Sequence, residues 1–536
     1  MGTYPVARPA SSAQAGPSVL TLLSNSEVSG ETRTRHLADT QMRSDAALSD
    51  MRVAGPTLQE IVSMVDFRTA EGGKTRIDDN KLETLRSALR GSLLMPADDG
   101  YDVSRTLWNG MIDRHPAAIV RAAGAGDVMQ AVNFARDNKL LLAVRGGGHN
   151  IAGRAACDGG LMLDLSAMKS VRVDPAAKRA RVEPGALLSD FDRETQAFGL
   201  STPTGINSTT GMSGLTLGGG FGWQSRKRGL TIDNLVAADV VLASGEFVQT
   251  SATQHPDLFW ALRGGGGNFG VVTSFEYQLY PLGPQVLAGL VVYPLDQAKQ
   301  VFEGYRKFTA AASDDMTAWL VMRKAPPLPF LPAEVHGKEV VVVAFCWIGD
   351  MSKGDEITKP LHGFGKPYGA HAGPMPFAGW QTAFDPLLAP GARNYWKSHD
   401  FKAMSVDVER ILCDAVAKLP SDECEAFIGQ LGGATNRVGA ADTAYPHRDA
   451  EFVLNVHTRW REAADDKKCI AWARGLFDAL TPHATGGVYV NFMPEDEAQR
   501  VAVGAYGPNF ERLSELKAKY DPANLFSQNQ NILPKA

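Results

Sequence analysis

The chain has 536 residues, more than one ordinary hydrophobic core organises, and this length predicts two domains. Its 54 lysines and arginines against 59 aspartates and glutamates give a formal net charge of −5. With no long basic run, this charge argues against a nucleic-acid partner. Five scattered cysteines without a CxxC pair indicate neither a zinc site nor a disulfide framework. No apolar run reaches the length of a membrane span, so the sequence predicts a soluble, cytoplasmic protein without a metal site.

The first 80 residues are rich in Ser, Thr, Ala and charge, and they predict a partly ordered extension with one possible helix around Pro56–Val65. The globular pattern begins near Lys81, where leucines recur at helical spacing and a glycine follows. A strand at Ala118–Arg121, an amphipathic helix at Ala125–Lys139 and an apolar strand at Leu140–Val144 come next.

After these elements, short apolar runs bounded by turn residues predict further strands and helices. The strands are Leu161–Leu165, Val171–Val173, Ala180–Val182, Ala237–Ala243 and Phe247–Thr250, and the helices are Leu188–Phe198 and Asp257–Leu262.

A triple-glycine turn, Gly146–Gly148, follows the apolar strand and Arg145, and His149 and Asn150 come directly after it. Without Cβ atoms this backbone approaches a ligand closely, and successive N–H groups form a concave anion site. A diphosphate with the rest of a nucleotide cofactor beside His149 fits such a turn. The alternative is a plain glycine-rich turn with a surface histidine.

Two more glycine-rich loops follow, at Ser201–Trp223 and at Arg263–Gly270. The second of these contains a G-x-G-x-x-G at Gly265, Gly267 and Gly270. A dinucleotide fingerprint needs a strand before it and a helix after it, whereas here a helix precedes and a strand-like segment follows. We therefore reject the Rossmann interpretation and expect the three loops to converge on one large cofactor.

These motifs together resemble the berberine-bridge-enzyme-like FAD-linked oxidases of the vanillyl-alcohol-oxidase superfamily. The resemblance rests on Arg145–Asn150, Gly211–Gly222, Asp233-Asn234, Leu258–Gly270, Tyr506–Asn509, Lys519–Pro522 and Gln530–Ile532. It covers roughly residues 85–536. It implies an α+β fold with a PCMH-type FAD-binding domain and a substrate domain in which helices cover an antiparallel sheet.

The implied organisation is a polar extension over 1–80, an FAD domain over 81–286 with its PCMH-type core at 113–284, a substrate domain over 287–495 and a returning C-terminal segment over 496–536. Strands of the substrate domain are expected at Leu290–Tyr293, Ala318–Arg323, Glu339–Cys346, Ala426–Leu431 and Val453–Arg459.

The resemblance also implies the cofactor and its contacts. FAD is expected on Arg145, Gly146, Gly147, Gly148, His149, Asn150, Asn207, Thr210, Gly211, Ser213, Gly214, Gly218, Gly219, Gly220, Val271 and Asn529. In the family the histidine after the glycines carries the flavin covalently. The cysteine that adds a second link in some members is replaced by Asn207, so His149 is the only expected attachment point.

On the substrate side, Tyr489 and Asn491 alternate in an expected strand and would project to one face, where they could position a substrate hydroxyl or amine. The alternative is a solvated strand face. Lys397 resembles a family position near the flavin, although a surface lysine is equally compatible with the pattern.

Some plant members carry a glutamate base three residues before a Gly-Gly pair, where this chain has Gly429. Proton removal would then fall to Tyr489 or to water. The sequence thus predicts an FAD-dependent oxidase, monomeric or homodimeric, that takes a hydride from an alcohol or amine carbon and reduces dioxygen to hydrogen peroxide. A dehydrogenase with another acceptor and a non-catalytic flavin-binding protein are the alternatives.

Overall fold

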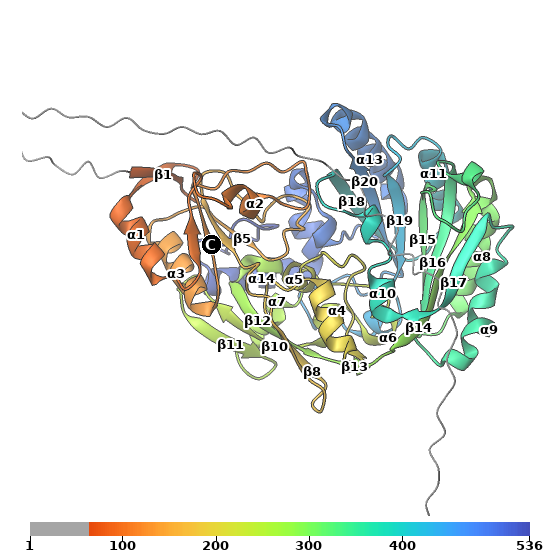
Figure 1. Ribbon diagram of the computed structural model, residues 1–536, viewed down its shortest axis with the longest axis horizontal. Coiled ribbons are helices and arrows are strands. Elements are labelled where there is room, and N and C mark those ends of the chain that lie inside the picture. Colours follow the sequence, from red (N-terminus) through yellow and green to blue (C-terminus); the bar gives the residue numbers. More distant parts are fainter. Residues whose placement is uncertain (1–63) are drawn as a thin grey trace, which may run out of the picture. The chain divides into compact units, whose positions relative to one another are not determined.

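A computed structural model describes residues 64–536 (Figure 1). The described chain opens with a hairpin of β1 (Met64–Arg68) and β2 (Lys74–Asp78). Its Phe67 and Ile77 are fully buried in a core with later elements, so the predicted start of the globular part at Lys81 was too late. The helix predicted at Pro56–Val65 lies mostly outside the described residues, and its last two positions belong to β1.

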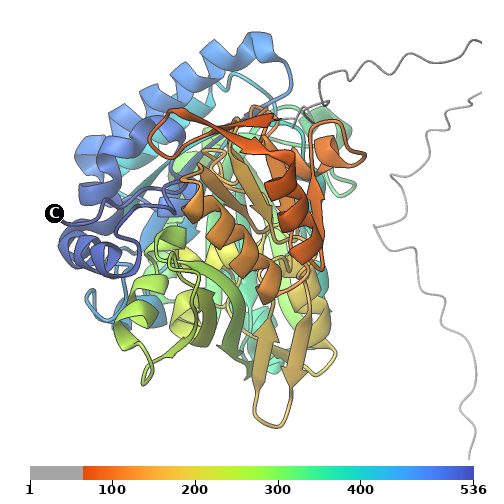
Figure 2. The same ribbon diagram turned by 90° about the vertical axis from the view of Figure 1, so that its left-hand side faces the viewer.

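A four-stranded sheet carries the first glycine loop. Its order is β3-β4-β6-β5, with β4 and β5 both parallel to β6. The strands are β3 (Ser92–Leu94), β4 (Ala118–Arg121), β5 (Leu142–Arg145) and β6 (Leu161–Asp164), and the nearby helices are α1 (Asp79–Ala88), α2 (Tyr101–Arg105) and α3 (Ala125–Asp137). α3 buries Val128, Ala131 and Val132, which share one helical face, as the periodicity predicted. In Figure 2 the helices of this region, drawn in orange, face the viewer.

A five-stranded sheet of order β11-β10-β12-β8-β7 follows. Its strands are β7 (Val171–Asp174), β8 (Arg179–Val182), β10 (Leu235–Val241), β11 (Phe247–Ser251) and β12 (Val271–Gln278). Around it lie α4 (Leu188–Gln196), α5 (Met212–Leu217), α6 (Ser225–Arg228), α7 (Pro256–Leu262) and the pair β9 (Leu200–Ser201) and β13 (Tyr280–Pro281). α7 precedes the third glycine loop and β12 follows it, which confirms that the Rossmann fingerprint does not apply.

The largest sheet has seven antiparallel strands in the order β17-β14-β16-β15-β19-β20-β18. They are β14 (Gln285–Pro294), β15 (Met316–Lys324), β16 (Glu339–Trp347), β17 (Gly369–Pro376), β18 (Arg393–Phe401), β19 (Glu425–Gln430) and β20 (Phe452–Trp460). The accompanying helices are α8 (Ala298–Ala311), α9 (Gly354–Thr358), α10 (Phe377–Gln381), α11 (Val406–Val416), α12 (Ala434–Arg437) and α13 (Asp466–Leu480).

Strand alternation gives this sheet two different faces. One face packs against α8, α11 and α13, of which α11 and α13 lie at the top and α8 at the right of this part in Figure 1. This face is almost wholly aliphatic and aromatic, as at Leu320, Ile428 and Leu454. The opposite face presents aromatic residues such as Trp319 and Phe427 together with polar side chains. This second face closes the cavity described below.

The C-terminal segment ends with α14 (Phe510–Tyr520), which lies beside α7 in Figure 1. The fully buried Lys517 ammonium pairs with Asp521 at 2.7 Å and donates to the carbonyl of Asn268 at 2.8 Å. The Ile532 amide donates to the Asn268 side chain. These contacts join the last residues to the third glycine loop. Within residues 64–536, no helix is both long and apolar enough to cross a membrane.

Candidate functional site

A cavity of about 310 Å³ lies between the three glycine loops and the polar face of the seven-stranded sheet. Most of the residues predicted from the sequence line it. These are Gly146, Gly147, Gly148, His149, Asn150, Asn207, Thr210, Gly211, Ser213, Gly214, Gly218, Val271, Asn529, Tyr489 and Asn491. Segments more than 300 residues apart in the chain therefore meet at one site.

The first and second glycine loops touch through their backbones. A Cβ atom on Gly147 would lie 2.4 Å from Gly211 Cα, and one on Gly211 would lie 2.5 Å from the Gly147 nitrogen. Only residues without side chains permit this approach. The amide groups of Gly146, Gly147 and Gly148 donate no hydrogen bond within residues 64–536. Free N–H groups on a glycine turn are the donors that a diphosphate needs, so this loop fits the FAD that the sequence predicts.

His149 stands at the cavity end of this loop, where its ring stacks on Trp108 with centroids 4.7 Å apart. Its Nε2 lies 2.9 Å from Thr209 Oγ1, and that hydroxyl donates to Asn207 Oδ1 at 2.8 Å. Because the hydroxyl proton is already committed, Thr209 accepts from an Nε2–H, and the lone pair of His149 is on Nδ1. Burial lowers the pKa of His149 to about 3, so the ring is neutral at physiological pH.

Tyr489 and Asn491 meet in a way that the sequence did not predict. The expected strand is wrong: Val490–Phe492 is a 3₁₀ turn. Asn491 Nδ2 donates to the Tyr489 hydroxyl at 3.2 Å, and the amide of Gly220 donates to the same oxygen at 2.9 Å. A Cβ atom on Gly218 would lie 2.3 Å from Asn491 Oδ1, so the second glycine loop makes room for this amide.

Four predicted site residues do not line the cavity. The ammonium of Lys397 pairs with Glu497 at 2.5 Å and lies over the Phe477 ring, on the far side of β18. The prediction of Lys397 beside the flavin is wrong for this strand register, since the neighbouring Trp396 faces the cavity instead. The Arg145 guanidinium donates to the Ser104 carbonyl. Gly219 and Gly220 also lie outside the lining, packed around Tyr489 and Thr231.

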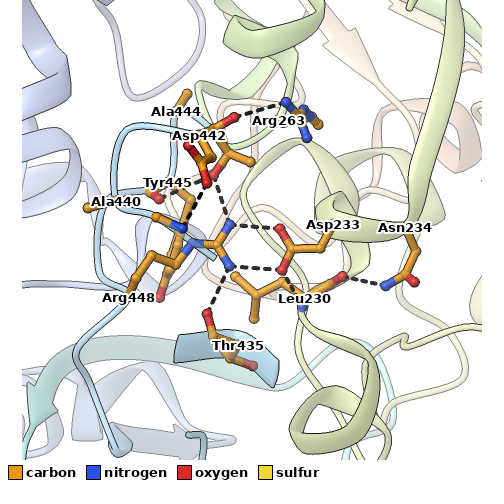
Figure 3. Close-up of polar contacts among 12 residues, drawn as sticks. Leu230, Asp233, Asn234, Arg263, Thr435, Ala440, Asp442, Ala444, Tyr445 and Arg448 are labelled. Atoms are coloured by element: carbon orange, nitrogen blue, oxygen red, sulfur yellow. Dashed lines mark hydrogen bonds and ion pairs between the residues drawn. The ribbon is translucent and has the colours of Figure 1, made fainter. Parts of the chain in front are cut away.

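A buried ion pair fixes the segment that carries Tyr445 against the glycine loops (Figure 3). Arg448 binds Asp233 with two hydrogen bonds of 2.8 Å each. The side chains are 3% and 8% exposed. On the same segment, the Asp442 carbonyl accepts from Arg263, which opens the third loop. A bidentate ion pair fixes the relative orientation of its two side chains as well as their distance. This pair therefore holds the Tyr445 segment against the loops around the cavity.

Sequence reasoning missed one group of cavity residues, all from the polar face of the seven-stranded sheet. They are Trp396, Glu425, Phe427, Asn455 and His457. The Glu425 carboxylate binds Arg323 at 2.6 Å and His457 Nδ1 at 2.9 Å. Burial alone would raise the pKa of Glu425, but the Arg323 charge and the His457 hydrogen bond outweigh it and lower that pKa to about 2. The only signal in the sequence is the alternation of Asn455, His457 and Arg459 along the second half of β20.

Comparisons with known proteins agree with this site. The family described as "FAD binding domain" matches residues 116–251, and "Berberine and berberine like" matches residues 488–533. The FAD-linked oxidoreductase YgaK of Bacillus subtilis (strain 168) is 31% identical over 456 residues, covering 84% of this chain and 98% of the relative.

A second relative is the (R)-6-hydroxynicotine oxidase of Paenarthrobacter nicotinovorans, 32% identical over 478 residues, 85% of this chain and 99% of the relative. Among solved structures, the 6-hydroxy-D-nicotine oxidase from Arthrobacter nicotinovorans superimposes with a TM-score of 0.74 at 29% identity, covering 83% of this chain and 98% of that one. The predicted α+β fold of the FAD oxidases is thereby confirmed. The chain belongs to the berberine-bridge-enzyme-like family of FAD-linked oxidoreductases, and FAD is its cofactor.

Proposed function

We propose that this enzyme is an oxidase that removes a hydride from an alcohol or amine carbon of a small organic substrate and passes the electrons to dioxygen, releasing hydrogen peroxide. The observation that carries the proposal is the cavity that the glycine loops, His149, Tyr489 and Asn491 line together. The relative named for 6-hydroxynicotine oxidation supports an amine or alcohol of modest size.

The residues around the cavity have two roles, binding the cofactor and positioning the substrate. The free amides of Gly146–Gly148 would hold the diphosphate of FAD, and Asn529 and Val271 would border the rest of the cofactor. When bound, FAD supplies the hydride acceptor. The protein then has two tasks. It holds the substrate carbon in place, and it accepts the proton of the substrate hydroxyl or amine.

Tyr489 is a hydrogen-bond donor in this scheme. Burial raises the pKa of Tyr489 to about 12, even though Asn491 and the Gly220 amide both donate to its oxygen. The phenol therefore keeps its proton at neutral pH and is free to donate it to a substrate oxygen or nitrogen. It is unsuited to be the base that the missing carboxylate at Gly429 calls for.

A single covalent link to FAD through His149 is part of the proposal. The neutral ring, its fixed tautomer and its lone pair on Nδ1 describe a nucleophile held in place. Asn207 has no thiol and accepts from Thr209. The fully buried Cys157 thiol has a pKa raised to about 12 by burial, so it is a poor candidate for a second link.

Acid precipitation tests the link. The precipitated polypeptide should remain yellow, whereas His149→Ala should release its FAD into the supernatant while still binding it in the folded state. Peptide mapping after cleavage at Arg154, which separates His149 from Cys157, should find flavin on the His149 peptide. A colourless wild-type pellet, or flavin on the Cys157 peptide, contradicts the single-link proposal.

The reaction is tested by anaerobic titration with a panel of alcohols, sugars and amines, followed by admission of air. At least one compound should bleach the flavin absorbance, and air should restore it within seconds with stoichiometric hydrogen peroxide. Bleaching without rapid reoxidation identifies a dehydrogenase. No bleaching by any compound contradicts the enzymatic proposal and leaves a flavin-binding protein.

A further inference from the structure

Four side chains form a straight row across the polar face of the seven-stranded sheet. In the strand register Arg323 lies opposite Glu425, Glu425 opposite His457, and His457 opposite Trp396. Arg323, Glu425 and His457 are each at most 9% exposed. The last three members of the row line the cavity. A buried charged row at a cavity wall is costly unless every charge is paired, so the pairing within the row is informative.

The row fixes the protonation of the His457 ring. Arg323 binds one oxygen of the Glu425 carboxylate at 2.6 Å, and His457 Nδ1 lies 2.9 Å from the other oxygen. An ionised carboxylate only accepts hydrogen bonds, so Nδ1 carries a proton, and in the neutral ring Nε2 therefore carries the lone pair. That Nε2 atom is buried and has no hydrogen-bond partner among residues 64–536. The Trp396 ring packs against the imidazole at 4.7 Å and holds its plane.

An unpaired hydrogen-bond acceptor on a side chain that lines the cavity is what the reaction lacks elsewhere. The titratable side chains that line the cavity in the described chain are His149, Arg154, Glu425, His457, Tyr489 and Tyr506. Burial raises the pKa of both tyrosines, so neither is a base at neutral pH. The Glu425 oxygens are occupied by Arg323 and His457, and His149 bonds Thr209 through Nε2 and carries the proposed flavin link on Nδ1. His457 is the group that remains.

The place of His457 relative to Gly429 supports the same role. Gly429 lies on β19 four residues after Glu425, so both positions belong to the same face of the strand. A Cβ atom on Gly429 would lie 3.1 Å from the Phe221 ring, so a larger residue there would have to displace an aromatic wall residue. Glu425 and its cross-strand partner His457 thus lie on the same face as Gly429, and both line the cavity.

We propose that His457 Nε2 accepts the proton of the substrate hydroxyl or amine while the hydride leaves the adjacent carbon, with Glu425 and Arg323 as positioning residues. The inference rests on the oxidase function proposed above. In the step, the C–H bond breaks with its electron pair going to the bound FAD as hydride. The O–H or N–H bond breaks with its proton going to Nε2, and its electron pair forms the C=O or C=N bond. Solvent takes the proton from His457 after product release.

The tautomer is tested without turnover. In the flavin-loaded protein labelled with ¹⁵N-histidine, the signals that disappear in His457→Asn belong to His457. They should show a protonated Nδ1 and an unprotonated Nε2 at neutral pH, and Glu425→Gln should alter this pattern while the FAD content is retained. A proton on Nε2, or a doubly protonated ring throughout the pH range of activity, overturns the proposal.

The role in the reaction is tested by anaerobic stopped-flow reduction with a compound that bleaches the wild-type flavin. His457→Asn keeps a donor for Glu425 and removes the basic ring nitrogen, so the limiting reduction rate should fall by about 100-fold or more with FAD content and thermal midpoint preserved. The control is His399→Asn, since His399 lies on β18 and stacks on Phe477, outside the cavity lining; this variant should retain the rate.

Two results have different meanings in this experiment. A wild-type rate retained by His457→Asn overturns the role of His457 and leaves the oxidase function standing. Failure of every alcohol and amine to reduce the wild-type flavin overturns the oxidase function, and with it the role of His457 as the proton acceptor, whatever tautomer the spectra show.

Discussion

Tyr489 shows how a single residue receives its role from its neighbours. Two donors, the Gly220 amide and the Asn491 side chain, occupy lone pairs of the phenol oxygen, and its one proton is left for a third partner. The ring also packs edge-on against Phe221 and Phe492, at 5.2 and 4.8 Å between centroids. The hydroxyl is therefore held at a fixed point of the cavity wall, which is what positioning a substrate requires.

Tyr489→Phe tests this role. The variant keeps the aromatic packing and loses the hydroxyl, so FAD binding should be unchanged while the anaerobic rate of flavin reduction falls about 10-fold, the equivalent of one hydrogen bond of roughly 1.4 kcal/mol. Tyr445→Phe is the matched control, because Tyr445 packs 6.3 Å from Tyr489 outside the cavity lining. Equal rates in wild type and Tyr489→Phe contradict the positioning role.

At the scale of elements, the site depends on loops that touch one another. The first and second glycine loops are in backbone contact at Gly147 and Gly211, and the third loop approaches the Tyr445 segment at Gly264, whose φ of +120° suits only glycine. The Arg448–Asp233 ion pair ties that segment in place. These close contacts explain why each of the three loops contains glycine where another part of the chain approaches its backbone.

Gly147→Ala tests the loop contact. The added methyl group would lie 2.4 Å from Gly211 Cα, a contact with backbone that cannot move aside cheaply. We expect the free energy of unfolding to fall by about 1–3 kcal/mol and FAD binding to weaken, as measured by chemical denaturation and by the flavin-to-protein absorbance ratio. In Gly126→Ala, in α3, the methyl group meets nothing within 4 Å, and this control should be neutral or slightly stabilising. Normal flavin content and stability in Gly147→Ala would show that the loops separate freely.

At the scale of the whole described chain, α4 from the loop-bearing part meets α10 from the large-sheet part. Gln381 Nε2 donates toward Asp192 Oδ2 at 3.1 Å, Thr204 Oγ1 at 2.9 Å and the Gly205 carbonyl at 3.0 Å. Burial raises the pKa of Asp192 to about 7, although the hydrogen bond from Gln381 partly opposes this shift. The Asp192 carboxyl group between α4 and α10 is therefore more stable in the folded protein when it is neutral than when it is ionised.

Asp192 should make stability depend on pH. Its folded pKa of about 7 lies above the ordinary 3.8, so its favourable contribution is complete below about pH 4 and is lost as the pH rises through 7. Asp192→Asn removes this titration. Unfolding free energies of both proteins, measured by denaturant at several pH values from 4 to 8, should diverge in favour of the variant by about 4 kcal/mol. A difference that stays constant across this range contradicts the assignment.

The first glycine loop of the cavity was predictable from the sequence because its requirements are local. Strand β5, the glycine turn at Gly146–Gly148 and His149 are adjacent in the chain, and consecutive glycines favour a backbone that a ligand can approach closely. The α3 and β4 boundaries agreed within two residues for the same reason, since periodicity is a local property. The turn at Val490–Phe492 was mistaken for a strand because an alternating pattern of five residues fits both structures.

By itself, the sequence determined the cofactor, the family and the glycine loops that line the cavity, since all three depend on residues close together in the chain. Only the tertiary structure decided what faces those loops. Arg323, Glu425 and His457 come from three strands spread over more than 130 residues, and they form one row because antiparallel pairing sets their register. The same register turns Lys397 away from the cavity and Trp396 toward it. Register is set when one face of a whole sheet is buried against its helices, so it depends on strands that lie far apart in the chain.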